Sequence, residues 1–523
     1  MNASTLAARA TIPTPAPDPP SAGARPDPRR GLVLATALVA ALGMFLSIYN
    51  AAIAGSDYSE ITKELGGSQV DIQWVTTAYR ASQGLVIPAA AWLCRRFGTR
   101  RVFLASMLLY ALTSALCGMA GNLDVLVAAR VLQAVPGAVT PVVCMLIFYA
   151  VVPLERMAAV LSAYVIVVVS GVGFAPLVGG FLGQYVTWRM IFFGVVPVAL
   201  VVMVAGARLL PATPGRPGER PDLAGLLLSG VGLASLLIAV SKGQDWGWTS
   251  YPVLILLTVG LDALALFVYV ELRVAHPLLN LRIFRNAPFV MAALLIDVMF
   301  TGLFLVLALV PSFLTQVQGL TPTNAGLVMV PQALAWMVAT PLAVRLFVRR
   351  GTRLPAVLGT VLLGGGTLML VRINVDLPRP ELALWLSVRA FGLGLVATSI
   401  LGASVATLAP AVVPDALAIR LVFQRIASGI SVALLTALVN ARRQQIFADR
   451  AALLSPDRVA GDPRIQHMRE QGPDGLLPLW QQLQNHSLAQ AYSDVFLVSG
   501  ALTLLCVVGI LIVRWGPAPG RRA

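Results

Sequence analysis

The sequence predicts an all-α protein that crosses a membrane many times. Of its 523 residues, 58% are hydrophobic and only 12% are charged, and the mean hydropathy is +0.81. A soluble protein of this length would split into several domains and carry about a quarter charged residues, so the composition excludes that class. Because a helix needs about 20 apolar residues to cross a bilayer, the apolar residues suffice for about fourteen such helices.

Fourteen apolar runs follow an N-terminal tail. The tail, residues 1–30, is rich in proline and alanine, ends in two arginines and lacks a signal-peptide cleavage pattern, so we expect it to be disordered. Each run is long enough for a membrane span. The runs, with ends accurate to a few residues, are 32–55, 69–92, 102–119, 123–150, 158–183, 189–209, 223–241, 251–271, 288–312, 323–344, 354–371, 382–408, 418–440 and 494–514.

The arginines between the runs predict the orientation of the chain, because cytoplasmic connections carry an excess of arginine and lysine. With the N-terminus inside, alternate connections are arginine-rich, as at 95–101 and 345–353, whereas the intervening short connections carry few basic residues. The pattern predicts an even number of spans, a cytoplasmic (inner) membrane location and both termini in the cytoplasm. It also accounts for the net charge of +15 as topology signals and lipid contacts, so we expect no nucleic-acid partner.

An internal repeat divides the chain into two halves. The arginine-rich segment around Gly98 is similar to the one around Gly351, 253 residues later, and Arg130 matches Arg389, 259 residues later. Similar offsets indicate two homologous six-helix halves with two helices inserted between them. The expected units are a cytoplasmic tail at 1–30, a six-helix bundle at 31–209, a linker with two extra spans at 210–287, a second six-helix bundle at 288–514 that includes an external loop at 441–493, and a cytoplasmic tail at 515–523.

Two motifs in the first half resemble those of the major facilitator superfamily. Residues 91–102 resemble its loop signature between spans 2 and 3, although Ala91 replaces the first glycine of that signature and Arg95 its acidic residue. The basic and glycine positions of this loop motif are Arg95, Arg96, Gly98, Arg100 and Arg101. In the fourth run, Arg130 and Gln133 stand as in the R-x-x-Q-G motif of the family, with Ala134 in place of its glycine.

A third motif in the fifth run resembles the antiporter motif G-x-x-x-G-P-x-x-G-G of the same superfamily. Its positions are Gly171, Ala175, Pro176, Gly179 and Gly180, with Ala175 in place of one glycine. Small residues let two helices approach closely, and a proline removes a backbone hydrogen bond and permits bending. Those properties suit a helix that rocks between two packings, so we interpret the motif as a conformational hinge.

The resemblance covers nearly the whole chain beyond residue 30 and narrows to one branch of the superfamily. Segments 188–197 and 488–496 resemble the openings of spans 6 and 14 in the fourteen-span drug:proton antiporters, the EmrB/QacA-like group. Membership implies the major facilitator fold, with two six-helix bundles and two inserted helices. It also implies proton-driven export of drugs, and a periplasmic adaptor protein as partner if the source has an outer membrane.

The first run departs from that group at its acidic position. The group carries an acid in an L-D-x-T-I pattern, whereas Asn50 follows Tyr49 at the matching place here. Asp57 stands seven residues later on nearly the same helical face, about 20° away. Two interpretations stay open: Asp57 takes over the proton site, or it is a solvated residue at the exit of the first run.

Several ionisable residues lie inside other apolar runs, where a charge is costly unless it is paired or faces water. Asp297 falls near the middle of the ninth run and is either a coupling acid or half of a structural ion pair with a neighbouring arginine. For Asp262, which lies in the inserted pair of helices, we favour a structural or lipid-edge role. Arg80 either pairs with Asp57 or faces the cavity, where it would favour an anionic substrate.

Two sets of candidate residues follow. Arg130 matches the motif arginine that the resemblance implicates in proton transfer, with helix packing through backbone carbonyls as the alternative. The candidates for proton coupling are therefore Asp297, Asp57 and Arg130. The candidates for a substrate cavity are Tyr49, Asn50, Arg80, Gln133, Arg389 and Arg425.

The sequence contains no P-loop and no Cys/His metal-binding spacing, so we expect no catalytic residue, metal or cofactor, with the proton gradient as energy source. The predicted function is proton-driven efflux of small hydrophobic or amphiphilic compounds by alternating access. One alternative is a dedicated exporter of a single endogenous metabolite or lipid, with an anionic compound among the cargoes considered. Another is a membrane scaffold or sensor that does not transport, which the motif in the fifth run argues against.

Overall fold

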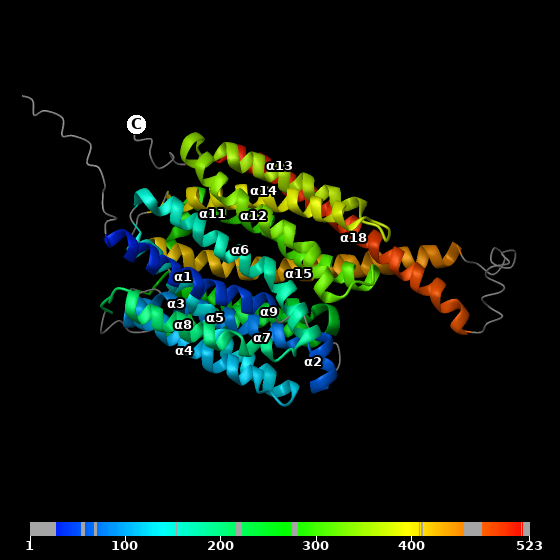
Figure 1. The fold of residues 1–523 in the computed structure, drawn as a ribbon, viewed down its shortest axis with the longest axis horizontal. Helices are drawn as coiled ribbons and strands as arrows, with labels where there is room; N and C mark the ends of the chain where they lie inside the picture. Colours follow the sequence, from blue (N-terminus) through cyan, green and yellow to red (C-terminus); the bar gives the residue numbers. More distant parts are fainter. Residues whose placement is uncertain are drawn as a thin grey trace, which may run out of the picture.

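The computed structural model consists of α-helices with a few short 3-10 and π turns (Figure 1). It describes residues 28–53, 58–66, 71–152, 154–215, 222–274, 281–406, 412–453 and 473–513, with the single residues 408 and 515. Within these ranges no β-strand is present. The prediction of an all-α fold is thus confirmed.

A helix lies at each predicted apolar run. The long helices are α1 (Pro28–Ile53), α3 (Trp74–Phe97), α4 (Thr99–Gly118), α5 (Leu123–Val151), α6 (Leu154–Tyr185), α8 (Val195–Leu209), α9 (Leu223–Trp246), α10 (Tyr251–Glu271), α11 (Ala287–Ser312), α12 (Pro322–Arg350), α13 (Arg353–Met369), α14 (Arg379–Ala406), α15 (Val413–Leu453) and α18 (Pro473–Ile512). Two short helices, α2 (Tyr58–Leu65) and α7 (Met190–Phe193), precede α3 and α8.

Among the described residues, 11 helices are long and apolar enough to cross a membrane. The helices α3, α6 and α15 stand at the remaining predicted runs and are not among these 11. In α3 the reason is its polar residues, Arg80 and Gln83 among them, which lower its hydropathy. The chain is therefore a multi-pass membrane protein, and the count of fourteen spans stays a prediction.

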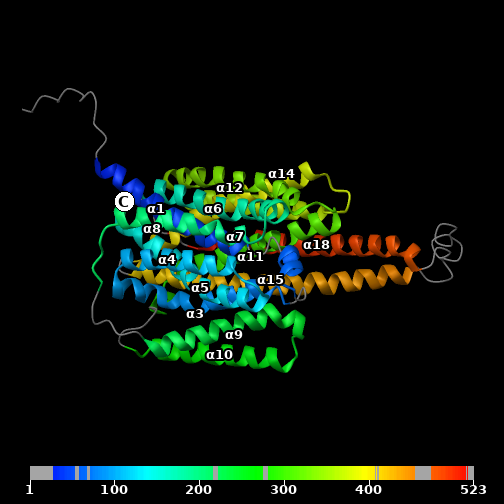
Figure 2. The ribbon, with the colours of Figure 1, turned by 60° about the horizontal axis from the view of Figure 1, so that its bottom comes forward.

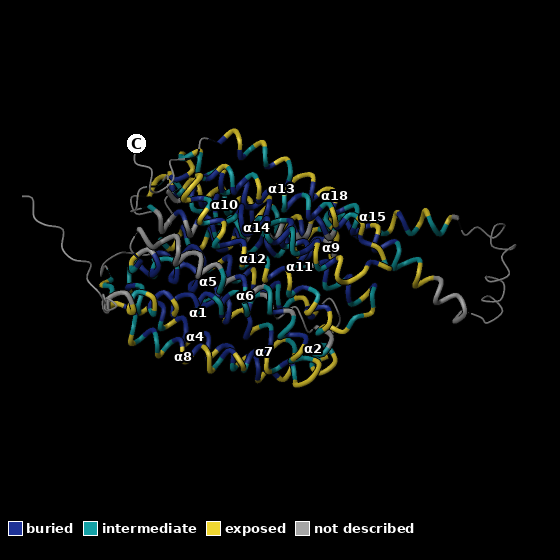
Figure 3. Tube along the Cα trace, turned by 45° about the horizontal axis from the view of Figure 1, so that its top comes forward, coloured by how far each residue is buried: buried dark blue, intermediate teal, exposed yellow. Residues whose placement is uncertain are grey.

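The outer surface of the helices is apolar, as a lipid-facing surface must be. Large side chains such as Leu112, Val201 and Ile255 are 56%, 67% and 60% exposed. Figure 3 shows exposed and buried positions alternating along the outer helices, so that one side of each helix packs inward. A soluble protein rarely exposes so much contiguous apolar surface.

The helices pack as two groups side by side (Figure 1). In the N-terminal group, α1, α3, α4, α5 and α8 enclose an apolar core that includes Phe103, Tyr110 and Cys144. In the C-terminal group, α11, α13, α14 and α18 pack together, with α12 against α14. Two helices connect the groups, because α6 packs on α12 and α15 packs on α3.

The inserted helices α9 and α10 form a hairpin at the edge of the molecule (Figure 2). Helix α9 packs on α3, where Thr77 Oγ1 and Ser241 Oγ lie 2.8 Å apart and the Lys242 ammonium lies 5.2 Å from the centre of the Trp74 ring. Helix α10 packs on α9 and presents much of its surface outward. Asp262 is exposed on α10, so its side chain lies away from the cores of both groups.

Both ends of the segment predicted as an external loop, 441–493, are helical, and its external position stays a prediction. Helix α15 continues to Leu453 and α18 begins at Pro473, and the two helices extend together beyond the bundle (Figure 2). Polar side chains hold them side by side: Arg442 pairs with Asp494 at 2.7 Å and Arg443 Nη2 donates to Gln484 Oε1 at 2.7 Å. These partners let a polar sequence stay helical outside the apolar core.

Candidate functional site

Arg130 lies at the centre of a polar cluster inside the N-terminal group. Its side chain has no exposed surface. Its Nη1 donates to Asn50 Oδ1 at 2.5 Å and to Gln133 Oε1 at 2.6 Å, and its Nε donates to the Val75 carbonyl at 3.3 Å. The guanidinium also lies 4.1 Å from the centre of the Tyr79 ring. The fold thus brings together three residues that the sequence predicts, Asn50, Arg130 and Gln133.

The cluster joins four helices through neutral groups. Gln133 Nε2 donates to Ser114 Oγ at 2.7 Å, so α4 is linked to the contacts that Arg130 makes with α1 and α3. Within the described residues, no carboxylate lies within salt-bridge distance of Arg130. Asn50 accepts where an acid would have formed an ion pair, so the contact persists without a titrating group.

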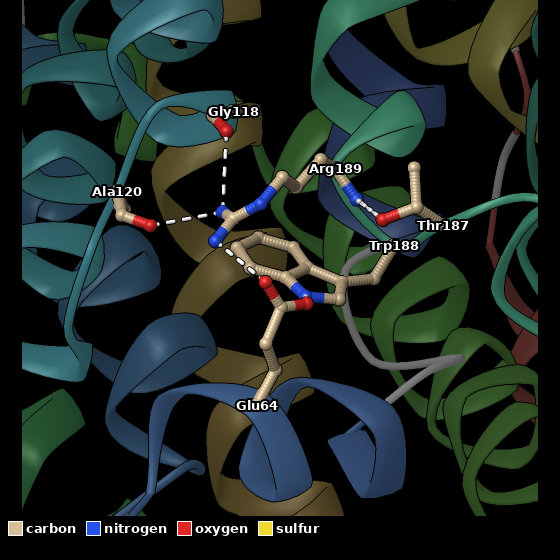
Figure 4. Close-up of polar contacts among 6 residues, drawn as sticks. All are labelled: Glu64, Gly118, Ala120, Thr187, Trp188 and Arg189. Atoms are coloured by element: carbon tan, nitrogen blue, oxygen red, sulfur yellow. Dashed lines mark hydrogen bonds and ion pairs between the residues drawn. The ribbon is translucent and has the colours of Figure 1, made fainter.

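A set of polar contacts around Glu64 and Arg189, called here the polar clamp, closes the end of the N-terminal group beyond Arg130 (Figure 4). Glu64 of α2 accepts hydrogen bonds from Trp188 Nε1 at 2.6 Å and from Arg189 Nη2 at 2.8 Å. Arg189 Nη1 donates to the carbonyls of Gly118 and Ala120 at 3.3 and 2.9 Å. Glu64 therefore ties α2 to the segment before α7, and Arg189 ties that segment to the end of α4 and the turn that follows it. Sequence reasoning singled out the segment with Trp188 and Arg189 but not Glu64.

Below this clamp, apolar side chains pack between the clamp and Arg130. The buried members of this apolar cluster are Ile61, Ile72, Val75, Cys117, Ala120, Leu126, Ala129, Ala175, Trp188, Ile191 and Phe192. The Phe192 ring centre lies 5.6 Å from the Arg130 guanidinium. The polar cluster around Arg130 is thus shielded from water at that end of the molecule.

The C-terminal group contains a buried ion pair between α11 and α15. Asp297 Oδ1 accepts from Arg420 Nη1 at 2.6 Å, and the two residues are 6% and 8% exposed. The other carboxylate oxygen, Oδ2, has no hydrogen-bond partner among the described residues. One turn further along α11, the hydroxyls of Thr301 and Ser431 lie 2.6 Å apart and join the same two helices. Asp297 therefore has the arginine partner that one of the two sequence interpretations requires.

Sequence reasoning missed Arg420. It stands two residues after the predicted start of its run, at 418, where an arginine is ordinary. The sequence favours Arg425, deeper in the same run, as the cavity candidate. The side chain of Arg425 lies outside the described residues. Beside Arg420, a small recess is lined mainly by apolar residues of α11 and α15, among them Phe289, Val290 and Phe423.

Arg389 occupies in the C-terminal group the place that Arg130 has in the N-terminal group. It is fully buried, and its Nε donates to Thr367 Oγ1 of α13 at 3.2 Å. Its two terminal nitrogens have no hydrogen-bond acceptor among the described residues. Unlike Arg130, it therefore lies in a site with few acceptors.

The remaining cavity and coupling candidates are placed as follows. Tyr49 is half-buried and stacks on Phe45, with ring centres 5.7 Å apart. Arg80 is exposed on α3, outside the Arg130 cluster. Asp57 lies outside the described residues, so the pairing of Arg80 with Asp57 stays a prediction.

The hinge motif lies where the two groups meet. A side chain at Gly180 would come within 3.0 Å of the backbone at Pro322, and one at Gly326 would come within 3.0 Å of the backbone at Leu177, so α6 and α12 are in close contact there. Gln184 Oε1 accepts from the Thr323 hydroxyl at 2.8 Å in the same region. Gly171, Ala175 and Gly179 are buried, and the side chain of Pro176 lies outside the described residues.

The loop motif makes a sharp turn at the opposite end of the N-terminal group. Gly98 has a φ of 86°, which a residue with a side chain rarely adopts, and its position against the Thr213 carbonyl leaves no space for a Cβ. Arg100 Nη2 donates to the Ala207 carbonyl, and the hydroxyls of Thr99 and Thr213 lie 2.8 Å apart. The turn is thus fixed to the end of α8. The side chains of Arg95 and Arg96 are half-buried, and that of Arg101 is exposed.

Comparison with known proteins agrees with this architecture. The chain is 30% identical over 519 residues to the multidrug resistance protein B homolog of Mycobacterium tuberculosis (strain ATCC 25618 / H37Rv), covering 96% of this chain and 94% of that protein. It is 26% identical over 500 residues to the tetracenomycin C resistance and export protein of Streptomyces glaucescens, covering 93% of this chain and 92% of that one.

Solved structures show the same fold at low sequence identity. The xylose:proton symporter XylE bound to 6-bromo-6-deoxy-D-glucose superposes with a TM-score of 0.57 at 13% identity, over 93% of this chain and 97% of that one. A bacterial homolog of the human lysosomal transporter Spinster, in an inward-facing and unoccupied conformation, gives 0.55 at 17% identity, over 94% and 99%.

The family assignment rests on most of the chain. Residues 40–434 match the Major Facilitator Superfamily, and this range includes the Arg130 cluster, the hinge motif and the Asp297–Arg420 pair. Its matched relatives are transporters, which places this chain among transporters rather than enzymes. The chain belongs to the Major Facilitator Superfamily.

Proposed function

We propose that this protein exports small hydrophobic or amphiphilic compounds, drugs among them, across the cytoplasmic membrane in exchange for protons. The relatives named for multidrug resistance and for tetracenomycin C export support drug efflux. The observation that supports proton exchange is the Asp297–Arg420 pair, a buried carboxylate at the contact between α11 and α15. Intramembrane acids of this kind commonly serve proton relays in transporters.

Asp297 is the acid among the predicted coupling candidates that lies within the described residues. Arg130, the other candidate there, is held by the neutral acceptors Asn50 and Gln133. Protonation of Asp297 would remove the charge that Arg420 pairs with, and would leave α11 and α15 joined there by weaker contacts. The free Oδ2 oxygen provides a position at which a proton can bind without first breaking the contact to Arg420.

Alternating access would act on the contacts between the two helix groups. At one end α6 and α12 touch through Gly180 and Gly326, and near the other end Ala91 of α3 shares an apolar cluster with Ala416 and Ile419 of α15. Transport requires one of these contacts to open while the other stays closed. Because Arg420 follows Ile419 directly, loss of the Asp297–Arg420 pair would bias the α3–α15 contact, and substrate would bias the equilibrium the other way.

The available driving force is sufficient for drug efflux. One proton moving down a potential of about 100 mV supplies about 2.3 kcal/mol, which corresponds to a roughly fifty-fold concentration ratio. The proton gradient would thus serve as the energy source with no further cofactor. A periplasmic adaptor, if the source has an outer membrane, belongs to the same proposal.

The decisive experiment measures substrate-evoked proton movement in proteoliposomes. A panel of lipophilic cations, neutral drugs and anionic amphiphiles is added to energised vesicles with a pH-sensitive dye inside. We expect a response to several members in the unmodified protein and at least about a hundredfold slower exchange in Asp297→Asn, with substrate binding retained, because a coupling acid cannot be replaced by a neutral amide.

Asp262→Asn is the matched control, because this acid is exposed on α10 and away from both cores. Proton exchange that is unchanged in Asp297→Asn would refute its coupling role. A dedicated exporter of one metabolite is the second candidate, favoured by the missing acid at Asn50 and by Arg80 in α3. That candidate predicts a flat response to the whole panel from folded protein.

A further inference from the structure

Arg389 is a fully buried cation whose charge has no counter-charge among the described residues. Its Nε donates to the Thr367 hydroxyl, whereas Nη1 and Nη2 have no acceptor and no carboxylate of the described residues forms an ion pair with it. A buried charge in a membrane is strongly unfavourable unless it is paired. The site therefore has the composition of one that is completed by an anion.

The internal repeat shows which acceptor of the Arg130 cluster is absent from the matching positions around Arg389. Ser114 and Thr367 are separated by the same 253 residues as the two loop glycines, and Gln133 and Gly392 by the same 259 residues as the two arginines. Gln133 supplies an acceptor to Arg130, but Gly392 has no side chain with which to do so. The C-terminal group has thus kept the arginine and the hydroxyl and lacks the side-chain acceptor that pairs with the arginine in the first half.

The free end of the guanidinium lies next to the Ser499 hydroxyl and the backbone of α11 at Gly302. A Cβ added to Gly302 of α11 would lie 3.4 Å from Arg389 Nη2 and 3.3 Å from Ser499 Oγ of α18. Both distances are tight for a Cβ, so a glycine at this position lets Arg389 Nη2 and the Ser499 hydroxyl converge on the backbone of α11. Four helices, α11, α13, α14 and α18, supply the residues of this site.

We propose that Arg389 and Ser499, which converge beside Gly302, bind a small anion that carries a single negative charge. Terminal guanidinium nitrogens donate well to a carboxylate or to a compact inorganic anion. The charge can come from two sources, a free anion such as chloride or the carboxylate of a transported compound. Such a site would balance the charge of Arg389 inside the C-terminal group.

The test measures the thermal stability of the purified full-length protein at constant ionic strength. Chloride, bromide, formate or benzoate replaces isethionate, a larger sulfonate, over a range of concentrations. We expect a saturable rise in Tm with anion concentration, because a ligand that binds only the folded state stabilises it. In Gly302→Ala, whose methyl group would lie within 3.4 Å of both Arg389 Nη2 and Ser499 Oγ, we expect the midpoint concentration to rise at least about tenfold. In Arg389→Gln the response should disappear.

Gly365→Ala in α13 is the matched control, since its Cβ meets nothing within 4 Å and the anion response should stay unchanged. A response to chloride, bromide and formate assigns a free anion, and a response to benzoate alone assigns the carboxylate of an amphiphile. The site is refuted if no anion raises Tm, or if Arg389→Gln and Gly302→Ala respond like the unmodified protein. Should Arg389→Gln fail to fold, anomalous scattering from bromide near Arg389 decides the question independently.

The Tm experiment measures anion binding without transport. Its failure would leave proton-driven export untouched, and the failure of export would leave the anion site untouched. The two proposals are therefore separable by experiment.

Discussion

Asn50 and Arg130 show how a neutral residue can hold a buried arginine inside a membrane. Asn50 Oδ1 accepts from Arg130 at 2.5 Å, while Gln133 and the Val75 carbonyl supply further acceptors. The Tyr79 ring adds a cation–π contact. Several neutral acceptors on three helices thus hold the guanidinium, where the family resemblance leads one to expect a single acid.

Asn50→Leu tests this interpretation at the scale of one residue. The leucine removes an acceptor from a buried guanidinium, so we expect a loss of stability of about 3 kcal/mol, seen as a lower Tm of the purified protein. Asn50→Asp should keep or raise Tm, because it restores a charge opposite Arg130. Equal Tm values for the leucine and aspartate variants would show that Arg130 does not depend on this contact.

The contact between α6 and α12 depends on residues without side chains. At Gly180 an added Cβ would lie 2.8 Å from the backbone carbon of Pro322, and at Gly326 one would lie 2.7 Å from the Cα of Leu177. Backbone atoms cannot move aside as a flexible side chain can, so only glycine permits this approach. Because no side chains interlock at these two glycines, α6 and α12 can separate and close again at this contact.

Gly180→Ala tests the role of this surface. Overpacking at such a contact costs about 1–3 kcal/mol, so we expect the closed contact to be disfavoured and the export rate to fall at least about fivefold. Gly402→Ala in α14 is the control, because its Cβ would meet only ordinary contacts at 3.5 Å or more, from Phe347. Efflux of a fluorescent substrate from vesicles measures both variants. Unchanged efflux in Gly180→Ala would exclude this contact from the transport cycle.

At the scale of the whole molecule, the helices alternate in direction and the extension of α15 and α18 projects from one end (Figure 2). The arginine pattern predicts that this end faces the outside and that the end with Gly98 and Arg349 faces the cytoplasm. The four native cysteines are buried and unpaired. An introduced cysteine can therefore be labelled selectively.

Labelling with a membrane-impermeant maleimide checks the orientation. We expect Gln481→Cys, exposed on the extension, to react in intact cells, and Arg349→Cys, exposed at the end of α12, to react only after permeabilisation. Cytoplasmic connections are rich in arginine because positive residues resist translocation. The reverse pattern of labelling would invert the predicted topology.

Some properties of this protein follow from sequence alone because they depend on local composition. Apolar length determines where a membrane helix forms, so the predicted runs and the all-α fold agree with the helices observed. The repeat offsets also anticipate that Arg130 and Arg389 occupy matching places. Glycine positions in the loop and hinge motifs predict a tight turn and a close helix contact for the same local reason.

Other properties depend on which side chains meet across distant helices, and only the tertiary structure decides them. Arg420 is separated from Asp297 by 123 residues, and Glu64 from Trp188 by 124, so no local pattern identifies either pair. The helical extension at 441–453 and 473–493 is likewise polar in sequence and is held by contacts across two helices. Buried charges need a partner wherever the fold places one, and that requirement is satisfied in space rather than along the chain.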